Sequence, residues 1–137
     1  DVWLEPKAWR ADGPRLWLGG ESVHDRLLRR IVEHAQGFHP LGTPSEEDMR
    51  RLGEGLAAAG RDLRELELVG GLRSPFPDDH SPAPLGPAIA ALPPLWERGF
   101  RTFCIKPNQY IDDVRAFPAW CREVVDRVGE LDLREAA

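Results

Sequence analysis

The sequence predicts an α/β fold in which four strand–helix units build a parallel sheet, in one domain over residues 1–137. Short apolar runs alternate with amphipathic stretches along the chain, and this alternation is typical of parallel strands joined by right-handed crossovers. At 42% hydrophobic residues, a chain of 137 residues can bury one core. The expected architecture is therefore a single layer of strands covered by helices.

The expected strands are short apolar runs bounded by turn-forming residues. Residues 1–14 are expected to form a loop or a short strand before the first good strand. The four strands are expected at 16–18, at 37–41, at 63–69 with an extension through 70–73, and at 100–105.

The expected helices have one apolar face and recognisable start signals. The first spans 23–35, with Ser22 as its N-cap. The second begins at 43–46, where Thr43 caps, Pro44 takes the first helical position and Glu46 completes a capping box. Gly60 is expected to end it.

Two later segments complete the series of helices. The third spans 85 or 87 to 97, disturbed by prolines at 93 and 94, and the fourth spans 114 or 118 to 128. Between the third strand and the third helix, the Pro-rich residues 74–87 predict an exposed loop.

Composition excludes several classes of function. A net charge of -5 is opposite in sign to what a nucleic-acid binder needs. No apolar run approaches the roughly 20 residues that cross a bilayer, and no leader is evident, so we expect a cytoplasmic protein. Cys104, in an expected buried strand, and Cys121, in an expected helix, are predicted to be free thiols in a reducing compartment. They lack the spacing of a metal site.

The end of the first strand carries a candidate anion site. Gly19 and Gly20 allow a ligand to approach the backbone closely, and the helix after Ser22 would direct free N–H groups towards an anion. The alternative is a tight strand–helix turn that binds nothing, which the spacing equally allows.

Four segments in chain order resemble the luciferase-like monooxygenase superfamily. PRLWLGG at 14–20 resembles its P-x-[LI]-W-[IV]-G-G strand, and AQGFHPLG at 35–42 resembles its A-D-G-W-x-P segment. GRD at 60–62 is similar to its A-G-R-D-P turn, and GFRTFCIKP at 99–107 resembles the final strand of the deazaflavin-dependent branch. Gln36 and Phe38 stand where the family usually has Asp and Trp.

The resemblance implies a (β/α)8 barrel, of which this chain would supply strands five to eight, since a full barrel needs roughly 250 residues. Half a barrel leaves two open edge strands and an uncovered apolar interior. We therefore expect a homo-oligomer, or a partner chain that supplies the N-terminal half-barrel. The alternative is that the chain is a fragment of a longer polypeptide.

The resemblance also implies site residues at the carboxyl ends of the strands. Gly19, Gly20, Glu21 and Ser22 would hold the cofactor phosphate, Glu21 through its backbone only. Gly37, Phe38 and His39 would contact the phosphate or ring end of a flavin; the alternative for His39 is a partly exposed loop histidine.

Two cations end the third and fourth strands. Arg73 and Lys106, with Gln109 nearby, would bind an anionic substrate or the cofactor tail, because a cation at such a mouth favours an anionic ligand. The alternative is a surface salt bridge with the acidic pairs at 78–79 or 112–113.

The function implied is that of an oxidoreductase acting on a small organic substrate with coenzyme F-420 (a deazaflavin) or FMN, by hydride transfer or monooxygenation. Enzymatic activity is expected only if self-association or a partner half completes the barrel. One alternative is a noncatalytic cofactor-binding or assembly module that retains the phosphate-binding half. Another is a structural remnant that binds no cofactor.

Overall fold

Four strands form an all-parallel sheet whose spatial order follows the chain order. The strands are β1 (Trp17–Leu18), β2 (Gly37–Phe38), β3 (Glu67–Leu72) and β4 (Thr102–Ile105). The computed structural model describes Trp9, Ala11 and residues 13–133, so most of the predicted N-terminal loop or strand lies outside the described residues. The predicted α/β class with a parallel sheet is confirmed. Over the described residues the sheet is open, with β1 and β4 at its edges.

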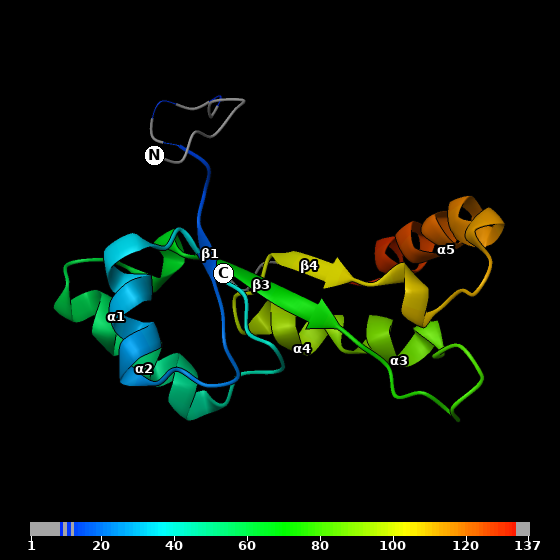
Figure 1. Ribbon diagram of the computed structural model, residues 1–137, viewed down its shortest axis with the longest axis horizontal. Coiled ribbons are helices and arrows are strands. Elements are labelled where there is room, and N and C mark those ends of the chain that lie inside the picture. The colour runs from blue at the N-terminus through cyan, green and yellow to red at the C-terminus, as the bar shows by residue number, and fades with distance from the viewer. Residues whose placement is uncertain (1–8, 10, 12, 134–137) are drawn as a thin grey trace, which may run out of the picture.

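Helices connect and follow the strands (Figure 1). The α-helices are α1 (Asp25–His34), α2 (Glu46–Ala58), α3 (Leu85–Ala90), α4 (Leu92–Glu97) and α5 (Phe117–Gly129). Short 3-10 turns are η1 (Leu63–Glu65), η2 (Pro107–Gln109) and η3 (Val114–Ala116). The expected disturbance of the third helix is confirmed, since the chain divides at Ala91 into α3 and α4 just before the two prolines.

Two predicted helix caps are wrong. His24, not Ser22, caps α1: its Nδ1 accepts a hydrogen bond from Leu27 N. Ser45, not Thr43, caps α2, and Asp48 closes the capping box with it. In each case the helix begins two residues later than expected, because a later side chain reaches the free N–H groups.

The third strand also begins later than predicted. Residues 63–65 form η1, capped by the Asp62 side chain, and β3 starts only at Glu67. Gly60 ends α2 as expected, with a φ of +72° that glycine adopts without strain. The second strand is shorter than expected, because it ends at Phe38 rather than at residue 41.

The hydrophobic core lies between the helices and one face of the sheet. Phe38, Leu68 and Leu72 point into it from β2 and β3. They pack with buried helical residues: Leu27, Ile31, Leu52, Leu56, Leu92 and Leu95. Trp120 of α5 stacks on Tyr110 and Phe117, with ring centroids 6.0 Å apart in each pair, and so packs α5 against the rest of the core.

Apart from the fully buried Val69, the opposite face of the sheet carries polar and partly exposed side chains. Glu67 accepts hydrogen bonds from Trp17 Nε1 at 3.2 Å and Thr102 Oγ1 at 2.6 Å, so these three side chains share that face. Trp17 crosses β2 at Gly37, where a Cβ atom would lie 2.4 Å from the indole ring. Cys104 lies on β4 and is exposed, which corrects the prediction of a buried thiol: the strand alternates faces, and Cys104 falls on the uncovered one.

Candidate functional site

A cavity of about 100 Å³ lies at the carboxyl ends of β2, β3 and β4. Four residues singled out from the sequence line it: His39, Arg73, Lys106 and Gln109. We call this cavity and these four residues the mouth. Each follows or ends a different strand or turn, and parallel strands bring their carboxyl ends to one edge of a sheet. Pro40, Leu41, Leu72 and Cys104 contribute the apolar part of the lining.

The two cations of the mouth, Arg73 and Lys106, are both exposed to solvent. Across the part of the chain that the structure describes, neither Arg73 nor Lys106 forms a salt bridge. The mouth therefore presents two positive charges to a ligand, and an anion is the complement that this arrangement favours.

Two of the four acidic loop residues considered as alternative partners, Asp78 and Asp113, are engaged elsewhere. Asp78 accepts hydrogen bonds from His80 N and from Ser81, and these lower the pKa of its carboxyl. Asp113 pairs with Arg115 in η3, and that hydrogen bond lowers the pKa of Asp113. The predicted alternative, in which these loops neutralise the mouth, is thus not formed by Asp78 or Asp113.

The glycine turn after β1 is close-packed. A Cβ at Gly19 would lie 1.9 Å from the carbonyl oxygen of His39, so only glycine fits where β1 and β2 end side by side. Gly20 O accepts a hydrogen bond from Leu41 N at 3.1 Å. The turn thus holds the segment that carries His39, although its own residues do not line the mouth.

The carboxylate of Asp48, a residue of α2, lies at the start of α1. Val23 N donates to Asp48 Oδ1 at 2.6 Å, and this hydrogen bond is the main cause of the lowered pKa of Asp48. The N–H group that a phosphate would use there is therefore occupied. Glu21 and Ser22 are exposed, and their backbone N–H groups donate to no other described residue. Any anion at this turn would use those outer groups rather than the helix proper.

Gly37 and Phe38 are buried away from the mouth. Phe38 is fully buried in the core among the helices, and Gly37 is covered by the Trp17 ring. Only His39 of this predicted trio lines the mouth, where its side chain is half-buried. We therefore leave Gly37 and Phe38 out of the proposed contacts.

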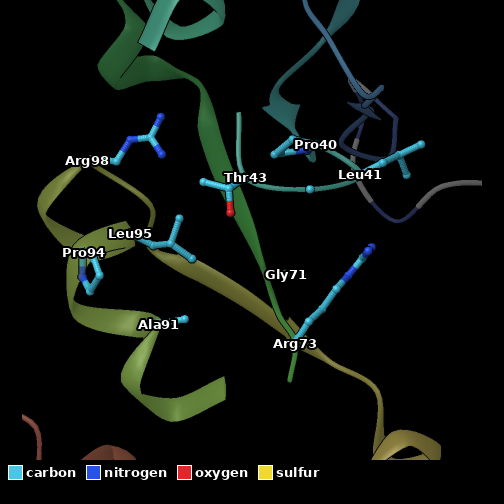
Figure 2. Close-up of a pocket in the computed structure, with 10 residues that line it drawn as sticks. Pro40, Leu41, Thr43, Gly71, Arg73, Ala91, Pro94, Leu95 and Arg98 are labelled. Carbon is cyan, nitrogen blue, oxygen red and sulfur yellow. The ribbon is translucent and has the colours of Figure 1, made fainter. Parts of the chain in front are cut away.

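A second and larger cavity adjoins the mouth and was not anticipated. It measures about 260 Å³, lies between residues 40–43 and α4, and shares Pro40, Leu41, Gly71 and Arg73 with the mouth. Figure 2 shows Arg98 and Arg73 at its two ends, with Thr43 between them. Arg98 belongs to the C-cap of α4 and carried no sequence motif, so only its tertiary contacts reveal its position.

Comparisons of the chain with protein-family models, with curated proteins and with solved structures found no match. Among the described residues, none of the helices combines the length and apolar character needed to cross a membrane. Nor do three or more His, Cys, Asp or Glu side chains in the described regions gather as candidate metal ligands. The geometry of the mouth is therefore the feature from which a function can be proposed.

Proposed function

We propose that this chain is the cofactor-binding half of a flavin- or deazaflavin-dependent oxidoreductase of the luciferase-like type. The observation that carries the proposal is the convergence of Arg73 and Lys106, both without salt bridges among the described residues, with His39 and Gln109 around one cavity. Ligands of parallel α/β barrels bind at the carboxyl ends of the strands, which is where this cavity lies.

The residues of the mouth suit an anionic cofactor. FMN carries a phosphate, and coenzyme F-420 carries a charged tail, and either anion would offset the two cations. Arg73 would offer a planar pair of donors, and Lys106 a compact charge. Gln109 would donate or accept through its amide, and His39 would hold or release a proton at its ring nitrogens. When bound, the cofactor supplies hydride transfer or, with FMN, oxygen activation.

The open sheet supports the proposal of half a barrel. Four parallel strands in chain order, covered by helices on one face, are what half of an eight-stranded barrel would contribute. We propose that a second copy of the chain, or a partner segment with four further strands, completes the barrel and supplies the rest of a small-molecule substrate pocket.

The test is a titration of the purified chain with FMN and with coenzyme F-420, followed by cofactor fluorescence. The wild-type chain is compared with Lys106→Gln and with the matched control Arg122→Gln, an exposed cation on α5 outside the mouth. We expect saturable binding that Lys106→Gln weakens about tenfold, the effect of losing one charge-assisted hydrogen bond. Equal affinity in Lys106→Gln and Arg122→Gln would overturn the assignment of the mouth.

A noncatalytic binding module is the second candidate function. The occupied N–H of Val23 and the burial of Phe38 leave fewer groups for a flavin than the resemblance implies. A chain that binds the cofactor anion at the mouth but supports no hydride transfer, even in its assembled form, would be this module.

A further inference from the structure

The second cavity is a slot that opens where β2 leaves the sheet. Gln36 O accepts from Glu67 N, so the β2 groups directed at β3 belong to residues 36, 38 and 40. Residue 40 is a proline and has no N–H to continue the ladder. The chain therefore departs from β3 after Phe38, and residues 40–43 pass along one side of a slot whose other side is α4.

One end of the slot is fixed by Arg98. Its Nη2 donates to Pro44 O at 2.6 Å, which ties the C-terminal end of α4 to the segment before α2. Its Nε also lies 3.4 Å from Oε1 of the exposed Glu46, so this guanidinium already has an acidic partner. The Thr43 hydroxyl faces the space between Arg98 and Arg73 and makes no hydrogen bond to another described residue (Figure 2).

The charge balance of the slot selects the kind of ligand. Arg98 is paired, whereas Arg73 has no acidic partner among the residues that the structure describes, so one positive charge is left to offset. The other walls are apolar and come from Leu41, Ala91, Pro94 and Leu95. A monoanion with an apolar body complements this lining better than a dianionic phosphate does, because a second negative charge would find no free cation there.

We infer that this slot binds a small organic carboxylate, with its carboxylate at Arg73, a hydrogen bond from Thr43, and its apolar body between Leu41 and Leu95. The planar guanidinium of arginine matches a carboxylate in two parallel hydrogen bonds. Arg73 and Leu41 line both cavities, whereas Thr43 and Ala91 line the slot but not the mouth, so variants at Thr43 and Ala91 test the slot separately from the proposed cofactor function. Arg73 is common to both cavities, so a ligand in one affects the charge available to the other.

The test uses benzoate and cyclohexanecarboxylate as probes and benzamide as the neutral control. Binding to the full chain is followed by changes in backbone amide chemical shifts. For molecules of this size we expect dissociation constants on the order of 1 mM for the two carboxylates and no saturation by benzamide. Two variants separate the cavities: Ala91→Phe fills the slot, and Lys106→Gln removes a cation of the mouth only.

Ala91→Phe and Thr43→Val are expected to weaken benzoate binding at least tenfold and fivefold, respectively, while Lys106→Gln leaves it unchanged. Thermal unfolding of each variant verifies that the fold is kept. If Ala91→Phe does not fold, Thr43→Val, which preserves side-chain volume, still tests the slot. The inference is overturned if neither carboxylate saturates, if benzamide binds equally well, or if Thr43→Val binds benzoate like wild type. Failure of the cofactor proposal would show instead as an unchanged flavin affinity in Lys106→Gln.

Discussion

Gly19 is the residue at which the geometry allows no side chain. A Cβ there would lie 1.9 Å from His39 O, and a backbone carbonyl cannot move aside as a flexible side chain would. Gly19→Ala is expected to lower the free energy of unfolding by about 2 kcal/mol or more, the cost of forcing extra volume into a close-packed site. Urea denaturation measures the difference.

Gly42→Ala is the matched control for Gly19→Ala. A Cβ at Gly42 has no neighbour within 4 Å, and the backbone there does not need a positive φ. We expect a change within about 0.5 kcal/mol, with a slight stabilisation from the stiffer unfolded chain. Equal effects of the two substitutions would contradict the close approach of β1 and β2.

Asp48 makes stability depend on pH. Its carboxylate accepts hydrogen bonds from Val23 N and Ser45, and these lower the folded-state pKa below the ordinary value. Because the folded pKa is depressed, the stabilisation is fully present above the unfolded pKa of about 3.9. It is lost as the pH falls through the folded pKa.

Asp48→Asn is expected to destabilise the chain at neutral pH by about 1 kcal/mol, as the loss of a helix cap does. It should also flatten the decline of stability below about pH 4, where the wild-type carboxylate gains its proton. Thermal unfolding at several pH values tests both effects, with the exposed Glu33→Gln as control. If the stability of Asp48→Asn declines on acidification as steeply as that of the wild-type chain, other groups cause the acid sensitivity.

Among the elements, α1 is closed at its C-terminal end by a residue from beyond α2. Arg61 donates to the carbonyl oxygens of Ile31, Val32 and Ala35 at 2.8 to 3.1 Å. Carbonyl groups at the end of a helix lack partners within the helix, and of these three Ile31 O also accepts a hydrogen bond from the backbone N–H of Ala35. The GRD segment thus has a structural task, whatever family it resembles.

Arg61→Met keeps the length of the side chain and removes its donors. We expect it to cost about 2 kcal/mol of unfolding free energy, as hydrogen bonds from a charged donor do. Arg64→Met, which breaks an exposed pair with Asp62, is expected to leave the free energy of unfolding nearly unchanged. If the two variants unfold at the same urea concentration, Arg61 does not hold α1 in place.

The order of the helices and strands was predictable because each element has its own local pattern of apolar residues. The residues at which the elements begin and end were less predictable, because they depend on side chains that are distant in the sequence. Apolar periodicity located all four strands and the helices. The start of α2 was misplaced because Thr43 and Ser45 are both good caps, and only the reach of Asp48 to Val23 decides between them.

The parts of the site were predictable to different degrees. That parallel strands end at one edge was enough to bring His39, Arg73, Lys106 and Gln109 together, and their role there stays a proposal. The slot could not be foreseen, because it requires Pro40 to leave the sheet and Arg98 to reach Pro44.

At the scale of the whole molecule, the uncovered face of the sheet is the main consequence of the fold. Trp17 is 41% exposed there, and Cys104 is accessible on the same face. If a second copy covers this face, maleimide should modify Cys104 quickly in dilute protein and slowly at high protein concentration. At the high concentration, light scattering should report a mass above the 15.4 kDa of one chain. A labelling rate independent of concentration, together with the mass of one chain, would contradict self-association.

An anion site at the mouth is tested most directly by mapping the backbone amide shifts of the isotope-labelled chain as FMN and, separately, riboflavin are added. We expect FMN to perturb residues 39, 73, 106 and 109 at the carboxyl ends of the strands, and riboflavin, which lacks the phosphate, to perturb them far less. Shifts confined to the opposite end of the sheet, around Glu67 and Thr102, or equal responses to both compounds, would contradict an anion site at the mouth.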